Sequence, residues 1–267
     1  MSSVELAADL EAVDLAHECL YRFLAATLRD PYADDWPVLL DMQNQRLACE
    51  ATDLLRAEAG TQSVQLGFGE LPAQRLDLRP LLGELRKPLA ELRAEYDRVF
   101  GLVVARECPP YETEYHPTSE TFFRSQQLAD IAGFYRAFGL EASRTQPERV
   151  DHLALELEFM AFMLLKKRLA LAGGNGNANA AEQACICDQA QGLFLKDHLA
   201  WWVPSFATGL RRKAGEGFYA ALGSLLAAFL ATERARFQVD PPRLPLQPAL
   251  IERPEEQSAC TACSVGG

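Results

Sequence analysis

An aspartate and a histidine stand side by side at Asp151 and His152, just ahead of a long apolar segment. A carboxylate next to an imidazole can act as a proton-transfer pair, so general acid–base catalysis is the first chemistry to consider. His152 and Glu156 lie four residues apart, on one face of a helix, but the HExxH pattern of zinc proteases is absent. Near the start of a helix, Asp151 can equally interact with the helix dipole. The pair therefore fits a proton-transfer site or a helix start.

Four cysteines form two close pairs, Cys185 with Cys187 and Cys260 with Cys263. Four thiolates can bind zinc or an iron–sulfur cluster. The second pair, however, lies close to the C-terminal glycines, in a segment with no obvious packing partner. The chain has seven cysteines, an odd number that favours a reduced setting over a disulfide framework. A metal-binding or electron-carrying protein stays open as one alternative, and labile, unligated thiols as the other.

A third group of polar and aromatic side chains follows Pro109 and Pro110 in the sequence PPYETEYH. Two prolines remove backbone donors and hold the residues before them extended, which predicts a rigid loop. This loop carries Tyr111, Glu112 and Tyr115. Tyrosines and a carboxylate on a rigid loop suit a recognition surface, although the same tyrosines can also pack against neighbouring helices.

Helices are expected on both sides of this loop, because apolar residues recur there at steps of three and four. The cleanest pattern precedes the loop between Leu82 and Val99, where Pro88 either starts a helix or kinks one. A second pattern follows the loop and stops at Gly139. A third starts with Pro147 as its first helical residue and continues through Asp151 and His152 to the basic residues 166–168.

The rest of the chain supports an all-α fold class. Ala and Leu dominate, Val, Ile and Thr are sparse, and no sustained alternating pattern predicts a strand. We expect one domain, a bundle of about ten helices over residues 1–239. The sequence GGNGNANA at residues 173–180 predicts a flexible linker. The proline-rich, cysteine-containing residues 240–267 predict a mobile tail.

Charge and hydropathy restrict the class of partner. The formal net charge of -11 argues against binding to nucleic acid or to an anionic membrane, and fits either a basic partner or an ordinary acidic protein. The N-terminal residues carry acids and no basic region, unlike a secretory signal. The longest apolar run, residues 218–231, is too short to span a bilayer. No glycine-rich phosphate loop is present. We expect a soluble, cytoplasmic protein.

Four stretches, taken in order, resemble the TorD/DmsD/NarJ family of maturation chaperones for redox enzymes. They are the acidic–aromatic helix end at residues 95–100, the PPYETEY loop at 109–115, the PERVDHL segment that runs on to 160, and the aromatic segment 194–222. The resemblance covers roughly residues 13–237. Thr113 departs from the serine common in the family, the linker is longer than is typical, and the cysteine-bearing tail has no counterpart.

This resemblance implies an all-helical chaperone without catalytic turnover and without a cofactor of its own. Such proteins bind the twin-arginine signal peptide or the apoprotein of a molybdenum enzyme in the cytoplasm until the pterin cofactor is inserted. They occur as monomers or as homodimers that exchange helices, and the linker could serve as the hinge. A hydrolase or nucleotide-dependent enzyme that uses the Asp–His pair and a cysteine-based metal carrier are the competing hypotheses.

The resemblance also implies site residues. Asp151 and His152 match a pair implicated in signal-peptide binding, and Tyr111, Glu112 and Tyr115 match the adjacent loop. Because a signal peptide is basic and then apolar, its receptor needs acidic groups beside an apolar groove. We therefore expect the tyrosines to line a groove, with Glu112, Asp151 and the neighbouring glutamate at position 114 near its rim.

Overall fold

The computed structural model describes residues 3–33, 36–60, 64–101, 107–116, 121–141, 143, 147–172 and 179–248. Within these ranges the chain forms ten α-helices and no extended strand, which confirms the expected all-α fold class. The helices are α1 (Ser3–Thr27), α2 (Pro37–Leu40), α3 (Met42–Ala59), α4 (Arg79–Glu84), α5 (Leu89–Phe100), α6 (Thr121–Ala137), α7 (Leu153–Ala172), α8 (Ala180–Phe194), α9 (Val203–Ala214) and α10 (Phe218–Arg236). Short 3₁₀ helices occur at Ala73–Arg75 and Glu112–Tyr115, and a π-helical turn at Leu195–Leu199.

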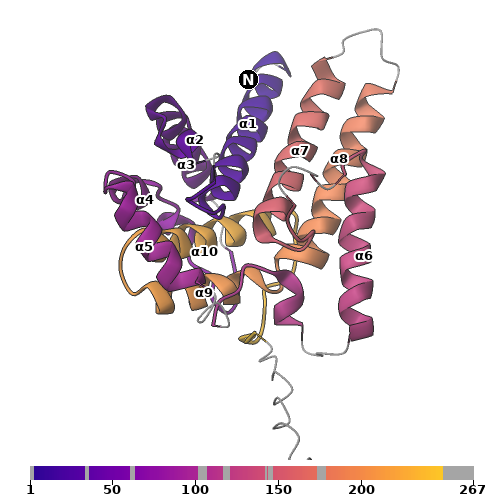
Figure 1. Cartoon of the computed structure of the whole chain (residues 1–267). Helices are drawn as coiled ribbons and strands as arrows, with labels where there is room; N and C mark the ends of the chain where they lie inside the picture. The colour runs from indigo at the N-terminus through magenta and orange to yellow at the C-terminus, as the bar shows by residue number, and fades with distance from the viewer. Residues whose placement is uncertain are drawn as a thin grey trace, which may run out of the picture.

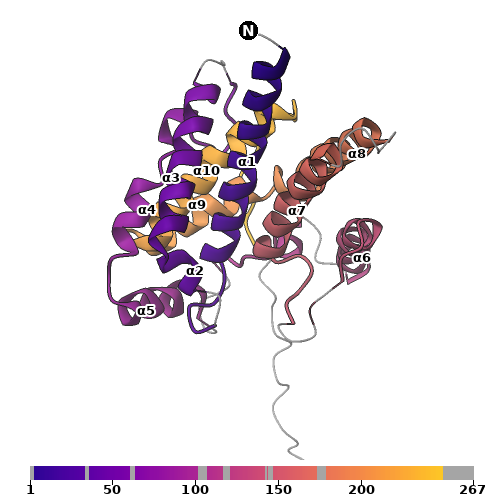
Figure 2. The same cartoon turned by 90° about the horizontal axis from the view of Figure 1, so that it is seen from above.

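Helix α1 lies between two groups of helices (Figures 1 and 2). It packs on α3 on one side and on α7 on the other, while α7 packs on α8 and α9 packs on α10. Helix α6 stands beside α7 and α8, on the side away from α1, in both views.

The core is centred on α10, which is apolar on nearly all of its faces and is surrounded by other elements. Its N-terminus is capped from a distance, because the Glu95 carboxylate of α5 accepts the N–H groups of Phe218 (3.1 Å) and Tyr219 (2.9 Å). Gly217 precedes them with φ +101°, and a Cβ there would meet the Glu95 carboxylate at 2.6 Å. No helix in the described part of the chain combines the length and the apolar character that crossing a bilayer requires.

Several boundaries follow the expected signals. Pro37 is the first residue of α2, Pro88 precedes α5, and the Asp41 side chain caps α3 by accepting the Asn44 N–H at 2.8 Å. Gly139, with φ +83°, ends α6 in the left-handed conformation that glycine adopts readily.

The expected start of α7 at Pro147 is wrong, because the helix begins at Leu153. The backbone and side chains of residues 149–152 instead contact the PPYETEY loop. These contacts keep the residues out of the helix, which therefore begins after them. The linker falls mainly on residues 173–178, which lie outside the described residues, and its last residue, Ala180, already belongs to α8.

Of the segment expected as a mobile tail, residues 240–248 are described, and they lie against the rest of the protein. The Pro242 carbonyl accepts the Phe68 N–H at 2.8 Å, and the Leu246 N–H donates to the Ser205 hydroxyl at 3.0 Å. Leu246 also packs against the core. A proline-rich chain is extended and keeps its carbonyls free, so it can lie along the surface without regular structure. Residues 249–267 lie outside the described residues.

Candidate functional site

The PPYETEY loop and the residues before α7 are joined through their backbones. Tyr111 and His152 form an isolated antiparallel bridge. The Glu112 N–H donates to the Asp151 carbonyl at 3.0 Å, and the Leu153 N–H donates to the Pro110 carbonyl at 2.9 Å. The two motifs that the sequence singled out, about forty residues apart, therefore meet in the structure.

Asp151 is fully buried, so its expected position at a groove rim is wrong. Its carboxylate accepts the backbone N–H of Thr113 at 3.2 Å and the Thr113 hydroxyl at 2.7 Å. Arg149 adds two further bonds, from Nε at 3.0 Å and from Nη2 at 2.8 Å. The Arg149 guanidinium also lies 4.2 Å from the centre of the Tyr111 ring. The charge of Asp151 is thus matched inside the protein, where it fixes the loop.

His152 acts as the cap of α7. Its Nδ1 accepts the Ala154 N–H at 3.1 Å, a bond that an N-cap side chain usually makes with oxygen. Burial lowers the pKa of His152 to about 4, so the ring is neutral at pH 7 and Nδ1 is available as an acceptor. The ring meets the Tyr111 ring edge-on, with centroids 5.0 Å apart. A buried, neutral imidazole in this position supports structure more readily than proton transfer.

Glu112 is also fully buried rather than at a rim. Its carboxylate accepts the Gln127 amide from α6 at 2.6 Å and the Trp201 indole N–H at 3.0 Å. His198 Nδ1 lies 3.2 Å from the second oxygen. Burial raises the pKa of Glu112, while its bonds to His198 and its neighbours oppose the shift. Glu112 therefore links the loop to α6 and to the chain that follows α8.

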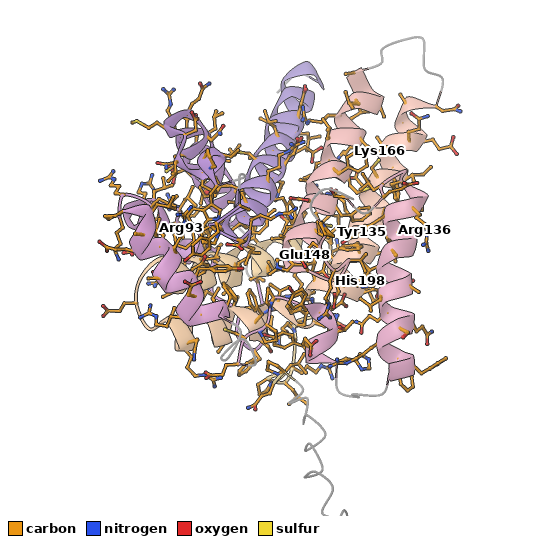
Figure 3. The ribbon with its side chains drawn as sticks, viewed as in Figure 1. Arg93, Tyr135, Arg136, Glu148, Lys166 and His198 are labelled. Atoms are coloured by element: carbon orange, nitrogen blue, oxygen red, sulfur yellow. The ribbon has the colours of Figure 1, made fainter. Side chains whose placement is uncertain are left out.

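The π-helical turn explains how His198 reaches Glu112. In this turn the Ala200 N–H donates to the Leu195 carbonyl at 2.7 Å, five residues back. The wider turn shifts the helical register by one residue between α8 and Trp201. Figure 3 shows His198 and Tyr135 in the space between α6 and α7, and the Tyr135 hydroxyl donates to the Val150 carbonyl at 3.0 Å.

Of the two loop tyrosines, Tyr115 belongs to the core and Tyr111 to its edge. Tyr115 is 2% exposed and its ring packs 5.1 Å from that of Trp202. Burial raises the pKa of Tyr115 well above its ordinary value. Tyr111 is half-buried, and its hydroxyl lies 3.4 Å from the Glu148 carboxylate. Among the five residues expected at the site, Tyr111 is the one that a ligand can touch directly.

Sequence reasoning gave no role to Arg149, Thr113, Gln127 and Trp201, which bind the buried carboxylates. A deeper carboxyl, Glu156, is fully buried below them. Burial first, and then the nearby charges of Glu112 and Asp151, raise its pKa well above the ordinary value, which favours the neutral form of Glu156. One signal in the sequence could have pointed to these residues, namely polar side chains within otherwise apolar segments. When such a segment is buried, its polar side chains need hydrogen-bond partners inside the protein.

The surface next to this polar network carries exposed and half-buried aromatic side chains, and we call it the aromatic shelf. It consists of His116, Phe122, Phe123 and Trp201. Phe122 and Phe123 of α6 are 71% and 43% exposed. The His116 ring stacks on Phe123 at 6.2 Å and meets Trp201 edge-on at 6.3 Å. A shallow hollow of about 660 Å³ opens here, and Asp130 at its edge is 65% exposed.

No arrangement of side chains among the described residues supports the proton-transfer hypothesis or the metal hypothesis. The Asp151 carboxylate bonds to Thr113 and Arg149 rather than to His152. Cys185 is exposed and Cys187 is buried on α8, so the two thiols face different surroundings. No group of three or more His, Cys, Asp or Glu side chains in the described ranges is placed to hold a metal ion. Cys260 and Cys263 lie outside those ranges.

The chain thus combines an all-helical body, a rigid loop fixed by buried carboxylates and an exposed aromatic surface. Comparison with known proteins specifies its class further. The chain belongs to the nitrate reductase delta subunit family, whose profile matches residues 70–208, just over half of the chain. This segment contains the loop, the start of α7, the π-helical turn and the first half of α9. The resemblance to the family of redox-enzyme chaperones is confirmed.

Three curated relatives illustrate the family. The chlorate reductase assembly chaperone protein of Ideonella dechloratans is 33% identical over 117 residues, which cover 43% of this chain and 54% of that protein. The selenate reductase assembly chaperone protein of Thauera selenatis is 32% identical over 117 residues, covering 44% and 56%. The chaperone protein TorD of Aeromonas salmonicida is 27% identical over 164 residues, covering 58% and 70%. The chain thus spans about half the length of the first two relatives. All three are named as chaperones.

Proposed function

We propose that this chain is a cytoplasmic chaperone that binds the apo catalytic subunit of a molybdopterin oxidoreductase, or its twin-arginine signal peptide, and assists cofactor insertion. The observation that carries the proposal is the family match across the loop and the start of α7, together with relatives named as assembly chaperones of chlorate and selenate reductases. The chaperone would have no catalytic turnover and no cofactor of its own. It would act as a monomer or as a homodimer that exchanges helices.

The five site residues enter the proposal in two roles. Tyr111 contacts the client, while Glu112, Tyr115, Asp151 and His152 hold the loop in a binding-ready conformation. Support for this division comes from burial, because the last four have at most 6% of their surface exposed. Ordering the loop in advance lowers the conformational entropy that client binding must overcome.

The apolar part of the client would lie on the aromatic shelf. Phe122 and Phe123 leave large apolar surfaces in water, and burial of such a side chain against a partner releases roughly 1.5–3 kcal/mol when it is complete. Aromatic side chains are also enriched at the centres of binding interfaces. The shelf and Tyr111 are connected through Glu112, whose carboxylate binds Trp201 and Gln127.

The test uses the gene in its own host. After deletion, we expect one molybdenum enzyme to lose activity and to accumulate without its pterin cofactor, while its catalytic subunit is still synthesised. The tagged full-length chain should co-purify with that same subunit when the subunit lacks the cofactor. Complementation with Phe122→Ser/Phe123→Ser should restore activity poorly, and complementation with the wild type fully. If every molybdenum enzyme of the deletion strain keeps its cofactor and its activity, the proposed function is wrong.

A further inference from the structure

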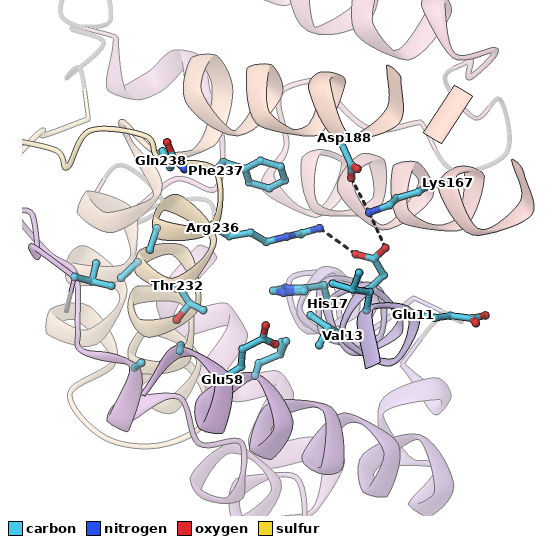
Figure 4. A pocket seen from close by; sticks show the side chains of 18 of the residues that line it. Glu11, Val13, His17, Glu58, Lys167, Asp188, Thr232, Arg236, Phe237 and Gln238 are labelled. Atoms are coloured by element: carbon cyan, nitrogen blue, oxygen red, sulfur yellow. Dashed lines mark hydrogen bonds and ion pairs between the residues drawn. The ribbon is translucent and has the colours of Figure 1, made fainter. Parts of the chain in front are cut away.

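Two largely buried cations, at the hollow that α1, α3, α7, α8 and α10 form, have carboxylate partners (Figure 4). Lys167 pairs with Asp14 at 2.7 Å and with Asp188 at 3.0 Å, and Arg236 pairs with Asp14 at 3.2 Å. Figure 4 shows Lys167 and Arg236 on either side of the carboxylate that they share. Lysine and arginine keep their protons throughout the physiological pH range, so these contacts do not change with pH.

His198 also lies between two carboxylates, but its contacts depend on a proton. The residue is 2% exposed, and its Nδ1 lies 3.2 Å from Glu112 Oε2. Its Nε2 lies 3.4 Å from the Oδ2 atom of Asp130, a residue of α6 whose side chain is 65% exposed. Among the described residues Nε2 has no hydrogen-bond partner, although Asp130 is within ion-pair distance. His198 therefore connects a buried carboxylate to one at the surface.

The partners of Glu112 decide which nitrogen of the His198 ring carries hydrogen. The amide nitrogen of Gln127 and the indole nitrogen of Trp201 donate to Glu112 Oε1 at 2.6 Å and 3.0 Å. Two such donors favour the charged form of Glu112. A carboxylate only accepts, so the nitrogen that faces it, Nδ1, carries a hydrogen. In the neutral ring Nε2 is then an acceptor, and it faces a second acceptor, the carboxylate of Asp130.

Protonation of the ring removes this mismatch, because the imidazolium form has a donor for each carboxylate. Histidine is the side chain that takes up or releases a proton between about pH 5 and 8. A proton on Nε2 is stabilised by Asp130 only while α6 is docked, so the docked state binds that proton more tightly. Docking of α6 is therefore favoured as the pH falls and weakened as the pH rises.

Helix α6 carries both this contact and part of the aromatic shelf. Gln127 and Asp130 lie one turn apart on α6, and they reach Glu112 and His198 respectively. Phe123 lies two turns before Asp130, and both line the shallow hollow of the shelf. Ile131 is the one buried side chain among the described residues of α6. The helix thus has few buried contacts, and each polar contact matters for its position.

We propose that His198 is a positioning residue of the aromatic shelf and that its hold on α6 depends on a proton. The protonated ring binds Asp130 as well as Glu112 and locks α6, and the neutral ring keeps Glu112 and releases Asp130. The hold on α6 needs no client. Its consequence rests on the proposed function: the client should bind the shelf more tightly near pH 6 than near pH 8.

The other charged groups of the elements around His198 leave the direction of this effect unchanged. Besides Glu112 and Asp130, these groups are Glu114, Arg124, Glu156, Lys196 and Asp197. Glu114 and Arg124 bond to each other at 3.0 Å. Lys196 and Asp197 are exposed. Burial raises the pKa of Glu156, which favours its neutral form.

The test follows α6 by amide hydrogen exchange in the full-length chain at about pH 6 and about pH 8, with each rate divided by the intrinsic rate at that pH. This window lies above the pKa of His152, which is about 4. In the wild type, the amides of α6 should be about two- to fivefold better protected at the lower pH, the effect of a partly exposed ion pair. Equal protection at both values, or better protection at pH 8, would overturn the proposal.

Two matched substitutions identify the carboxylate. Asp130→Asn changes an exposed side chain, so the fold should be kept, and protection of α6 should no longer depend on pH. Asp197→Asn makes the same change next to His198 in the chain, at an exposed position that forms no ion pair with a described residue. This control should keep the pH dependence of the wild type. Wild-type pH dependence in Asp130→Asn would refute the proposal.

Two further substitutions identify the histidine, because His116 lines the same hollow as Asp130. His198→Gln keeps a donor for Glu112 without a titrating ring, so the pH dependence should disappear. His116→Phe keeps a ring beside Phe123 and should keep the pH dependence. Loss of the dependence in His116→Phe, with the dependence retained in His198→Gln, would assign it to His116 and overturn the proposal. Thermal melting checks that each variant is folded.

Client binding is measured separately, with the cofactor-free catalytic subunit that the gene deletion identifies. The tagged wild type should retain severalfold more of this subunit near pH 6 than near pH 8, and Asp130→Asn should retain similar amounts at both. Equal pH dependence in the two proteins would refute the effect on the client. If the deletion identifies no client while α6 protection still depends on pH through Asp130, the proposed function fails and the hold of His198 on α6 stands.

Discussion

Replacement of Asp151 by alanine should destabilise the fold before it affects any ligand. The substitution removes the acceptor of four bonds, two from Thr113 and two from Arg149. Thr113 is 1% exposed, so its N–H and hydroxyl would be left without an acceptor and without water. Such an unsatisfied buried group costs about 1–3 kcal/mol.

The loss of the Arg149 pair adds less. The Arg149 side chain is 43% exposed and can return to water, and an ion pair of that kind contributes about 0–1 kcal/mol. The free energy of unfolding of Asp151→Ala should therefore fall by about 3 kcal/mol in total. This loss is at the lower end of the ~3–5 kcal/mol seen when one member of a fully buried pair is removed. At ~2–4 °C per kcal/mol for a chain of this size, the melting temperature should fall by about 6–12 °C.

The assay is urea unfolding followed by far-ultraviolet circular dichroism, with Thr113→Ser as the matched control. That variant keeps both donors and removes one buried methyl group, so its free energy of unfolding should fall by no more than about 1 kcal/mol. The client affinity of Asp151→Ala is then measured under conditions in which the protein is folded. If Asp151→Ala unfolds at the urea concentration of the wild type and yet loses the client, Asp151 contacts the ligand directly, and the reasoning from burial fails.

Three further predictions concern pH, the cap of α10 and the C-terminal segment. Because the folded pKa of His152 is about 4, below the ordinary value of 6.5, the unfolded chain binds the extra proton and stability should fall by a few kcal/mol between pH 6.5 and pH 4. In His152→Asn, which keeps a capping side chain, the urea midpoint should depend less on pH over that range, and an unchanged slope would contradict the assignment. Glu95→Ala should cost about 2 kcal/mol, since two N–H groups of α10 lose a charged acceptor; Glu91→Ala, on the exposed side of α5, should melt as the wild type does. Removal of residues 249–267 should leave the melting temperature unchanged, whereas removal of 240–267 should lower it, and equal melting of the two truncations would show that the docked segment adds no stability.

The helices could be predicted from the sequence because their apolar spacing and their end signals agree. Leu20 and Leu24 repeat on one face of α1, and Gly139 marks the end of α6. The start of α7 could not be predicted in the same way. Pro147 is a valid first helical residue by its own chemistry, but the pairing of His152 with Tyr111, a contact distant in sequence, decides that the helix begins later.

The burial of the acidic site residues could not be predicted either. A glutamate or aspartate is usually exposed, so a rim position was the reasonable expectation for Glu112 and Asp151. Their burial depends on Arg149, on His198 and on Trp201, and the last two come close only after the π-helical turn shifts the register. No local pattern encodes that shift.

The buried carboxylates and the exposed aromatic side chains have different roles in one connected region: the carboxylates fix the structure, and the aromatic side chains form its surface. Glu112 holds α6 through Gln127 and holds the following chain through Trp201, and both contacts lie directly beneath the aromatic shelf. A charged group buried among matched donors is costly to leave partly satisfied, so the network favours a single arrangement. The aromatic side chains above it are then presented in a fixed geometry, and the entropy of ordering them is spent on folding rather than on binding. Under the proposed function, Glu112 would matter for recognition without touching the ligand, and the apolar surface that it positions would make the contact.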